Sequence, residues 1–237
     1  MTTAFWYRAQ PNFGDQLMPV LWQRLAGVRL AWRRPSFARL FGIGSIAVRI
    51  PADFSGWVWG SGKMRASQRL DLRAARVLAL RGPLTAEGSG AGGVLLADPG
   101  LLASLLVRHP VRKGGTRHAT GIVPHYADDT LDMPGWHIDV QGGVDHVISE
   151  VASCGQVVTS SLHVLIAADS MGIPSMWVPS PAVVGDGFKF HDYQTSFDGR
   201  LMEPHVWRLA DQRLVAAKRE ALLDSMQAIA ADMGVAA

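Results

Sequence analysis

The sequence has little cysteine, little charge and no long apolar run. Its 237 residues include one cysteine, Cys154, so no intrachain disulfide can form and a reducing compartment is expected. Charged residues make up 18% of the chain and hydrophobic residues 48%, which is the composition of a globular domain. No apolar run approaches 18 residues, and the first residues lack a charged segment followed by an apolar core. We therefore expect a cytoplasmic protein without a signal peptide or a transmembrane helix.

The net charge and the spacing of the histidines indicate which classes of ligand the protein is expected to bind. A formal net charge of +3 suits anionic small ligands or an anionic membrane surface and is too weak to indicate nucleic acid. The densest basic segment, residues 108–113, is typical of a solvated linker. The eight histidines are dispersed, no C-x-x-C or H-E-x-x-H occurs, and Asp128 with Asp129 is typical of a solvated turn. We expect no metal and no cofactor, and a buried, inert thiol at Cys154, which has no basic neighbour.

Short apolar strands alternate with helical segments along the chain. Strands are expected at 4–7, 57–59, 76–80, 94–97, 121–124, 137–140, 156–160 and 175–178, and helices at 15–26, 101–107 and 144–153. This alternation favours parallel sheets covered by helices on both faces. The fold class is therefore α/β, with two Rossmann-like halves.

A break near residues 109–116 divides the chain. We expect two Rossmann-like domains, 1–110 and 116–203, that face a cleft, followed by a helical tail at 204–237. The tail has an apolar stripe of Leu222, Met226, Ile229 and Met233. Its other face mixes both signs of charge, so we expect the stripe to pack on the domains rather than on a membrane.

The segment from 156 to 175 carries the most chemistry. It predicts a buried strand, a helix that begins after Ser160 or Ser161, a glycine stop and a second strand. A helix N-terminus after a strand offers unpaired N–H groups and a positive dipole end to an anion. His163 lies in the first turn, where it would face a bound anion and donate a proton. The alternative is a packed or solvent-facing histidine.

Two glycine-bearing segments and the first helix start are candidate ligand loops. Asn12, Gly14 and Asp15 either cap the first helix or bring amides and a carboxylate to the cleft. Residues 42–47 lack the downstream carboxylate of a dinucleotide site, and residues 60–63 lack the leading glycine and the following Ser or Thr of a phosphate loop. Both are better explained as tight turns at a sheet edge, where ligands also bind.

Three further positions are candidates for contact with an anion or a sugar. Arg81 ends a strand, so it would either grip a carboxylate or phosphate or form a structural salt bridge, for example to Asp98. His125 also ends a strand and is a second candidate catalytic histidine. Late in the chain, Lys189 would neutralise phosphate and His191 or Asp192 would meet the sugar. A surface loop explains this late cluster equally well.

These segments occur in the order that is found in polysaccharide pyruvyltransferases, and residues 5–200 resemble the ExoV-like branch of that family. The matching pieces are NFGD at 12–15, GIGS at 42–45, WGSG at 59–62, RGPLT at 81–85, DPG at 98–100, GIVPHY at 121–126 and the serine-rich Leu-His turn before GIP. The resemblance implies a compact GT-B-like arrangement. It also implies transfer of a pyruvyl group from phosphoenolpyruvate to sugar hydroxyls, with a ketal formed during exopolysaccharide biosynthesis.

The resemblance also implies roles for residues. His163 would be the general acid, and Arg81, Lys189 and the amides near Ser160 and Ser161 would hold phosphate and carboxylate. Many members have an arginine where this chain has Ser161, although the ExoV-like branch commonly has serine. The partners implied are phosphoenolpyruvate and a saccharide acceptor, often lipid-linked, which leaves peripheral membrane association open.

Two other functions stay open from the sequence. A nucleotide-sugar glycosyltransferase of similar two-lobed fold would need a late acidic residue to hold ribose, and Asp192 is the candidate. A non-catalytic member of the fold would bind a glycan without turnover. The sequence identifies neither the acceptor sugar nor the oligomeric state.

Overall fold

The first half of the chain forms a six-stranded parallel sheet. The structure is a computed structural model that describes residues 2–107 and 116–234. The strands are β1 (Thr2–Phe5), β2 (Leu30–Trp32), β3 (Leu40–Phe41), β4 (Trp57–Ser61), β5 (Arg76–Leu80) and β6 (Leu95–Leu96). Their order in the sheet is β2-β1-β3-β4-β5-β6, and all of these pairs are parallel.

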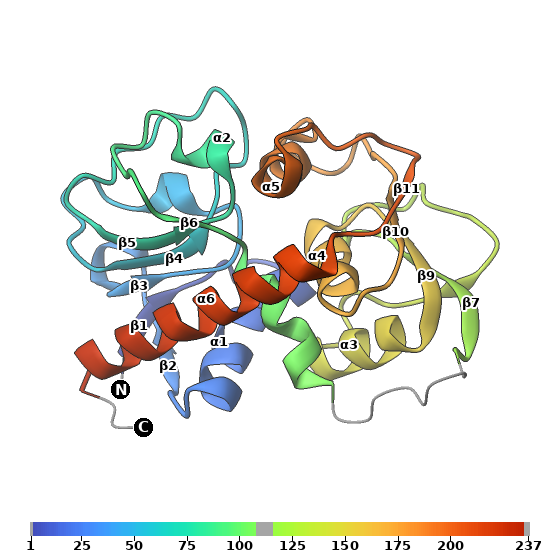
Figure 1. Cartoon of the computed structure of the whole chain (residues 1–237), viewed down its shortest axis with the longest axis horizontal. Helices are drawn as coiled ribbons and strands as arrows, with labels where there is room; N and C mark the ends of the chain where they lie inside the picture. The colour runs from blue at the N-terminus through green and yellow to red at the C-terminus, as the bar shows by residue number, and fades with distance from the viewer. Residues whose placement is uncertain (1, 108–115, 235–237) are drawn as a thin grey trace.

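The second half forms a five-stranded mixed sheet. Its strands are β7 (His118–Val123), β8 (Trp136–His137), β9 (Cys154–Thr159), β10 (Ser175–Trp177) and β11 (Trp207–Arg208). Their order is β11-β10-β9-β7-β8, and only the pair of β10 with β11 is antiparallel among those described. The expected α/β class with two Rossmann-like halves is confirmed (Figure 1).

Helices cover both sheets and connect the strands. They are α1 (Phe13–Leu25), α2 (Pro83–Ala86), α3 (Val144–Ala152), α4 (Leu162–Ser170), α5 (Phe188–Asp198) and α6 (Gln212–Asp232), with 3-10 segments η1 (Pro35–Phe37), η2 (Ala47–Arg49) and η3 (Pro99–Leu106). Within the described ranges, no helix is long and apolar enough to cross a membrane.

The C-terminal helix α6 runs from the second half back across the first (Figure 1). The Trp59 indole donates to the Ser225 hydroxyl at 2.8 Å, and the Lys218 ammonium donates to the Leu96 carbonyl. Leu222, Met226 and Ile229 are buried in the main apolar core. The expected packing of the tail stripe on the domains is confirmed.

Several expectations are corrected by the structure. The short strands β2, β3 and β11 were not predicted, because two or three residues show no periodicity. The cluster at 189–193 is part of helix α5 rather than a surface loop, and residues 99–106 are 3-10 rather than α-helical. The predicted domain boundary and the basic segment at 108–113 involve residues outside the described part of the chain, so both stay predictions. Cys154 is buried as expected.

A buried ion pair joins α5 to the first sheet. The Arg81 side chain, at the end of β5, donates through Nε to Asp192 Oδ2 at 2.8 Å, and both side chains have no exposed surface. Asp192 also accepts from the backbone N–H and hydroxyl of Thr85, and Arg81 donates to the Ser45 hydroxyl and the Lys63 carbonyl. Such complete pairing offsets the cost of removing two charges from water.

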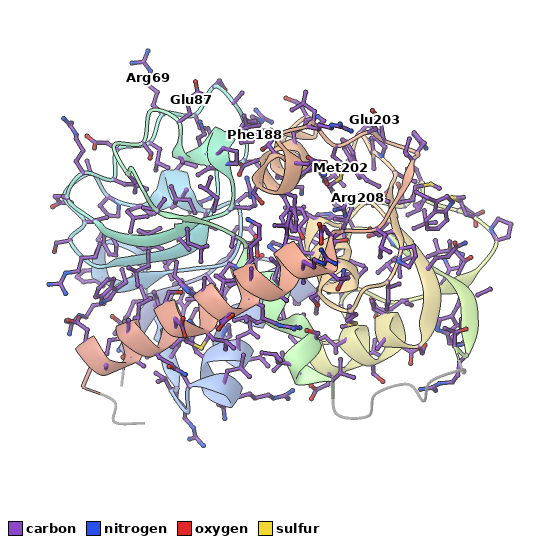
Figure 2. All side chains as sticks on the ribbon, viewed as in Figure 1. Arg69, Glu87, Phe188, Met202, Glu203 and Arg208 are labelled. Carbon is purple, nitrogen blue, oxygen red and sulfur yellow. The ribbon has the colours of Figure 1, made fainter. Side chains whose placement is uncertain are left out.

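The contact between α5 and the first half continues beside this ion pair. A Cβ added at Gly82 would lie 1.7 Å from the backbone oxygen of Asp192, so the two backbones meet where only glycine fits. The Lys63 ammonium lies 5.5 Å from the centre of the Phe188 ring, at the first residue of α5 (Figure 2). Helix α5 lies between β10 and β11 of the second sheet in sequence but is held against the first half.

We predict that Asp192→Ala lowers the free energy of unfolding by about 3–5 kcal/mol, because it leaves the Arg81 guanidinium buried without its counter-charge. Denaturant unfolding measures this change. The control is Asp71→Ala, which removes the exposed ion pair between Asp71 and Arg73 and should leave the unfolding midpoint almost unchanged. Equal effects of the two substitutions would contradict the prediction.

Candidate active site

A cavity of about 290 Å³ lies where the carboxyl ends of the two sheets meet. In the first sheet β1 lies between β2 and β3, and in the second sheet β7 lies between β8 and β9. The order therefore reverses between β1 and β3 and again between β7 and β9. Ligands of open parallel sheets bind at such reversal points. The loops after all four of these strands line the cavity.

Six of the residues expected at the site line this cavity: Asn12, Asp15, His125, Ser161, His163 and Lys189. Asn12 and Asp15 combine the capping role with a place in the cavity wall. The Asn12 carboxamide oxygen accepts from the Asp15 N–H at 3.0 Å, and its nitrogen donates to the Asp15 carboxylate. Burial raises the pKa of Asp15, against the opposing effects of the Asn12 hydrogen bond and of His163 and Lys189.

The imidazole of His163 is held between α1 and the loop after β6. His163 is the second residue of α4, whose N-cap Ser161 makes no side-chain capping hydrogen bond. Its Nε2 faces the Asp98 carboxylate at 3.7 Å. A Cβ added at Gly14 would lie 2.1 Å from its Nδ1, so the glycine is required by the close approach of this ring.

His125 is neutral at neutral pH. Burial, with the nearby charges of Lys189 and His163, lowers the pKa of His125 to about 4, while Asp128 opposes the shift. Its Nδ1 accepts from the Ala127 N–H at 3.2 Å, which places the proton of the neutral ring on Nε2. This histidine is therefore suited to donate a hydrogen bond rather than to act as an acid.

Lys189 is a cation without a counter-ion in the cavity wall. Its side chain is 8% exposed and makes no hydrogen bond or ion pair with the residues that the structure describes. Burial, with the charge of Arg81, lowers the pKa of Lys189 to about 8, while Asp15 opposes the shift. A largely buried ammonium in a cavity wall, with no hydrogen bond or ion pair, favours an anionic ligand there.

Five expected site residues do not line the cavity: Gly14, Arg81, Ser160, His191 and Asp192. Gly14 instead packs against the His163 ring. Arg81 and Asp192 are fully buried in their mutual ion pair, which favours the structural alternative for Arg81 and leaves neither accessible to phosphate, sugar or ribose. The partner of Arg81 is Asp192, not Asp98. His191 packs edge-on against Trp177, with ring centres 5.5 Å apart. Ser160 is also buried, and its role is described next.

Ser160 fixes the loop that carries His125. Its hydroxyl donates to Asp128 and accepts from the His125 N–H at 2.9 Å. Asp128 is therefore buried and hydrogen-bonded, and the expectation of a solvated turn at this residue was wrong. Among residues 2–107 and 116–234, no group of three or more His, Cys, Asp or Glu side chains is arranged to hold a metal.

Four cavity residues with polar or charged side chains were missed: Tyr7, Ser45, Arg49 and Tyr126. Ser45 and Tyr126 belong to the GIGS and GIVPHY segments identified in the sequence, and they lie in the loops after β3 and β7. Tyr7 was assigned to the first strand, which ends at Phe5. Arg49 ends the 3-10 segment η2 and is exposed at the cavity, where it adds a second positive charge.

Comparison with known proteins identifies the family. Residues 12–180, more than half of the chain, match the family described as "Polysaccharide pyruvyl transferase". The chain belongs to the polysaccharide pyruvyl transferase family, as its motifs had indicated. The match therefore includes Asn12, Asp15 and His163 of the cavity, whereas Tyr7 and Lys189 lie outside it.

Two curated relatives are similar to the chain. The chain is 26% identical over 215 residues to the succinoglycan biosynthesis protein ExoV of Rhizobium meliloti (strain 1021). This match covers 81% of this chain and 64% of that protein. The chain is 33% identical over 118 residues to the uncharacterized protein L143 of Acanthamoeba polyphaga mimivirus, which covers 44% of this chain and 40% of that protein. The chain spans less than two thirds of the length of either relative.

We predict that Gly14→Ala abolishes catalysis while the protein stays folded. The added methyl group would occupy the space of the His163 imidazole and displace it. Alanine favours the helix at this position, so secondary structure should be retained. Turnover and circular dichroism measure the two effects. Gly92→Ala is the control, since its Cβ would meet nothing within 4 Å, and a similar loss of turnover there would refute the explanation.

We predict that Lys189→Met stabilises the protein and removes anion binding. The fall of the lysine pKa from 10.5 to about 8 corresponds to a burial cost of roughly 3 kcal/mol, at about 1.4 kcal/mol per pH unit. A net gain of about 1–3 kcal/mol is expected from an apolar replacement. Thermal unfolding with and without an anionic ligand measures both effects.

The matched control is Lys218→Met. The pKa of Lys218 is also lowered to about 8 by burial, but this residue lies in α6 away from the cavity lining. Its substitution should leave anion binding intact.

In the wild type, the free energy of unfolding should rise with pH from about 8 to 10.5, because only the unfolded chain keeps both lysines protonated there. The rise should be lost in the double variant.

Proposed function

We propose that the protein transfers the pyruvyl group of phosphoenolpyruvate to two hydroxyl groups of a sugar, forming a cyclic ketal and releasing inorganic phosphate. The observation that carries this proposal is the unpaired Lys189 ammonium in a cavity that also holds His163 and His125, in a member of this family. The name of the ExoV relative supports a saccharide acceptor from exopolysaccharide biosynthesis.

The donor carries a phosphate and a carboxylate, and the cavity offers positive groups for both. Lys189 supplies a buried charge and Arg49 an exposed one. The N-terminus of α4 adds the backbone N–H groups of its first turn, which Ser161 does not cap with its side chain. These groups replace the Arg81 contact that the family resemblance implied, since Arg81 is committed to Asp192.

The chemistry begins with protonation of the donor. His163 gives a proton to the methylene carbon, which becomes the methyl group, and positive charge develops at the central carbon. One sugar hydroxyl adds to that carbon and gives its proton to His163, which returns to its protonated form. The bond from the central carbon to the phosphate oxygen then breaks. The second hydroxyl adds, and its proton leaves with the phosphate.

The other cavity residues stabilise charge and orientation. His125, neutral and protonated at Nε2, donates a hydrogen bond to the donor or the acceptor. Asp15 lines the same cavity and is placed to orient an attacking hydroxyl. We place the protein in the cytoplasm, with a lipid-linked saccharide as the acceptor class, in line with the mildly basic charge.

The nucleotide-sugar alternative has less support. It required Asp192 to hold a ribose, and that carboxylate is buried against Arg81. Among the described cavity residues of the second half there is no carboxylate. A non-catalytic role predicts ligand binding without phosphate release, so the same assays separate it from the proposal.

Thermal unfolding in the presence of phosphoenolpyruvate, with UDP in parallel, tests donor binding. We expect phosphoenolpyruvate at about 100 times its Kd to raise the midpoint by about 5–10 °C, and UDP to have no effect. The rise should shrink above pH 8, where Lys189 loses its proton. A response to UDP alone would favour the glycosyltransferase.

His163→Ala tests the general acid. The variant should keep the thermal shift with phosphoenolpyruvate but lose phosphate release by about 10²–10⁴-fold, measured with a saccharide acceptor. Full activity in the variant would remove His163 from the mechanism. Binding without release in the wild type, across acceptors, would favour the non-catalytic alternative.

A further inference from the structure

Two buried polar atoms near the cavity have no hydrogen-bond partner, and they face each other. They are Asp98 Oδ2 and His163 Nε2, which lie 3.7 Å apart. Asp98 follows β6 and has no exposed surface. Its other oxygen, Oδ1, accepts from the Gly100 N–H at 2.8 Å and caps η3. One oxygen of this carboxylate is therefore structural, and the second has His163 as its neighbour.

The two nitrogens of His163 have different surroundings. Nε2 is buried and faces Asp98. Nδ1 makes no hydrogen bond with the described part of the chain and is not among the buried unpaired atoms, so it keeps some exposed surface. It packs against Gly14, and His163 itself lines the cavity. The ring thus has an inner nitrogen beside a carboxylate and an outer nitrogen that a ligand can reach.

We propose that Asp98 is a positioning residue for His163: its carboxylate accepts the Nε2 proton and keeps Nδ1 as the nitrogen that exchanges a proton with the ligand. The catalytic role given to Asp98 rests on the proposed function, whereas the assignment of the His163 proton to Nε2 does not. A buried carboxylate oxygen and a buried ring nitrogen each carry a large cost when unpaired, and each is the other's available partner. Hydrogen bonds of catalytic groups are often long before the ligand binds and shorten with it.

The arrangement has a defined consequence for proton transfer. When both nitrogens are protonated, Nδ1–H donates its proton to the methylene carbon of the donor, and the Nε2 proton stays on the ring beside Asp98. The neutral ring that results has its lone pair on Nδ1, ready to take a proton from the attacking hydroxyl. Asp98 itself gains no proton in the cycle.

Nitrogen NMR of protein labelled with ¹⁵N-histidine tests the tautomer directly. In the wild type at a pH where the ring is neutral, we expect His163 to be protonated at Nε2, with its signals assigned by their loss in His163→Gln. Asp98→Asn keeps Oδ1 for Gly100 and places an amide donor opposite Nε2. It should therefore reverse the tautomer and protonate Nδ1.

Asp128→Asn is the matched control. Asp128 is another buried carboxylate beside the site, but its partners are Ser160 and Thr130. Its substitution should leave the His163 tautomer unchanged. A wild-type ring protonated at Nδ1 would overturn the proposal even if Asp98→Asn failed to fold, and so would a tautomer that Asp98→Asn does not alter.

Kinetics give the second readout. Asp98→Asn should lower kcat for phosphate release by about 100-fold or more, with KM for phosphoenolpyruvate changed less than about threefold, because no ligand-binding group is altered. If the wild type releases no phosphate but the tautomer reverses, the proposed function fails and the positioning role of Asp98 stands. If the wild type is active and Asp98→Asn matches it in kcat, the positioning role fails.

Discussion

The buried ion pair between Arg81 and Asp192 determines where the candidate active site has its charge. Asp192 fixes α5 on the first sheet, and Lys189 lies one turn earlier on the same helix, so the ion pair places the ammonium in the cavity wall. Burial lowers the pKa of Lys189 most, and the charge of Arg81 adds to this shift, while Asp15 opposes it. One interaction thus anchors the helix and commits the Asp192 carboxylate, so that it does not pair with Lys189.

The two halves contribute different chemistry to the cavity. The first half supplies the carboxylate of Asp15 and the amide of Asn12 from the start of α1, and the second half supplies both histidines. Each set follows a strand next to a reversal of strand order. Since both reversal points face the same space, neither half contains a complete site. This division explains why the ring of His163 packs against a glycine of the opposite half.

The sequence predicts those features that depend on local pattern. The alternation of strands and helices, the helix start before His163 and the capping by Asn12 are all encoded within a few residues. The pairing of Arg81 with Asp192 spans 111 positions and has no local signal, so Arg81 was assigned to a ligand and Asp192 to a sugar. Asp98 was considered as a partner of Arg81 and as part of the DPG segment, but not as a partner of His163. Arg49 lies in a short 3-10 turn, where no periodicity marks the side that faces the cavity.

Helix α6 has a consequence for the order in which the protein can form during synthesis. The Trp59 indole, in the main apolar core, has its hydrogen-bond partner in Ser225, 166 positions later. The apolar surface that Leu222, Met226 and Ile229 cover is therefore exposed on the growing chain until α6 has been made. Contacts of such long range slow folding and extend the time for which a chain can associate with others. The first sheet is synthesised first, but its apolar surface is covered only when α6 follows the last strand of the second sheet.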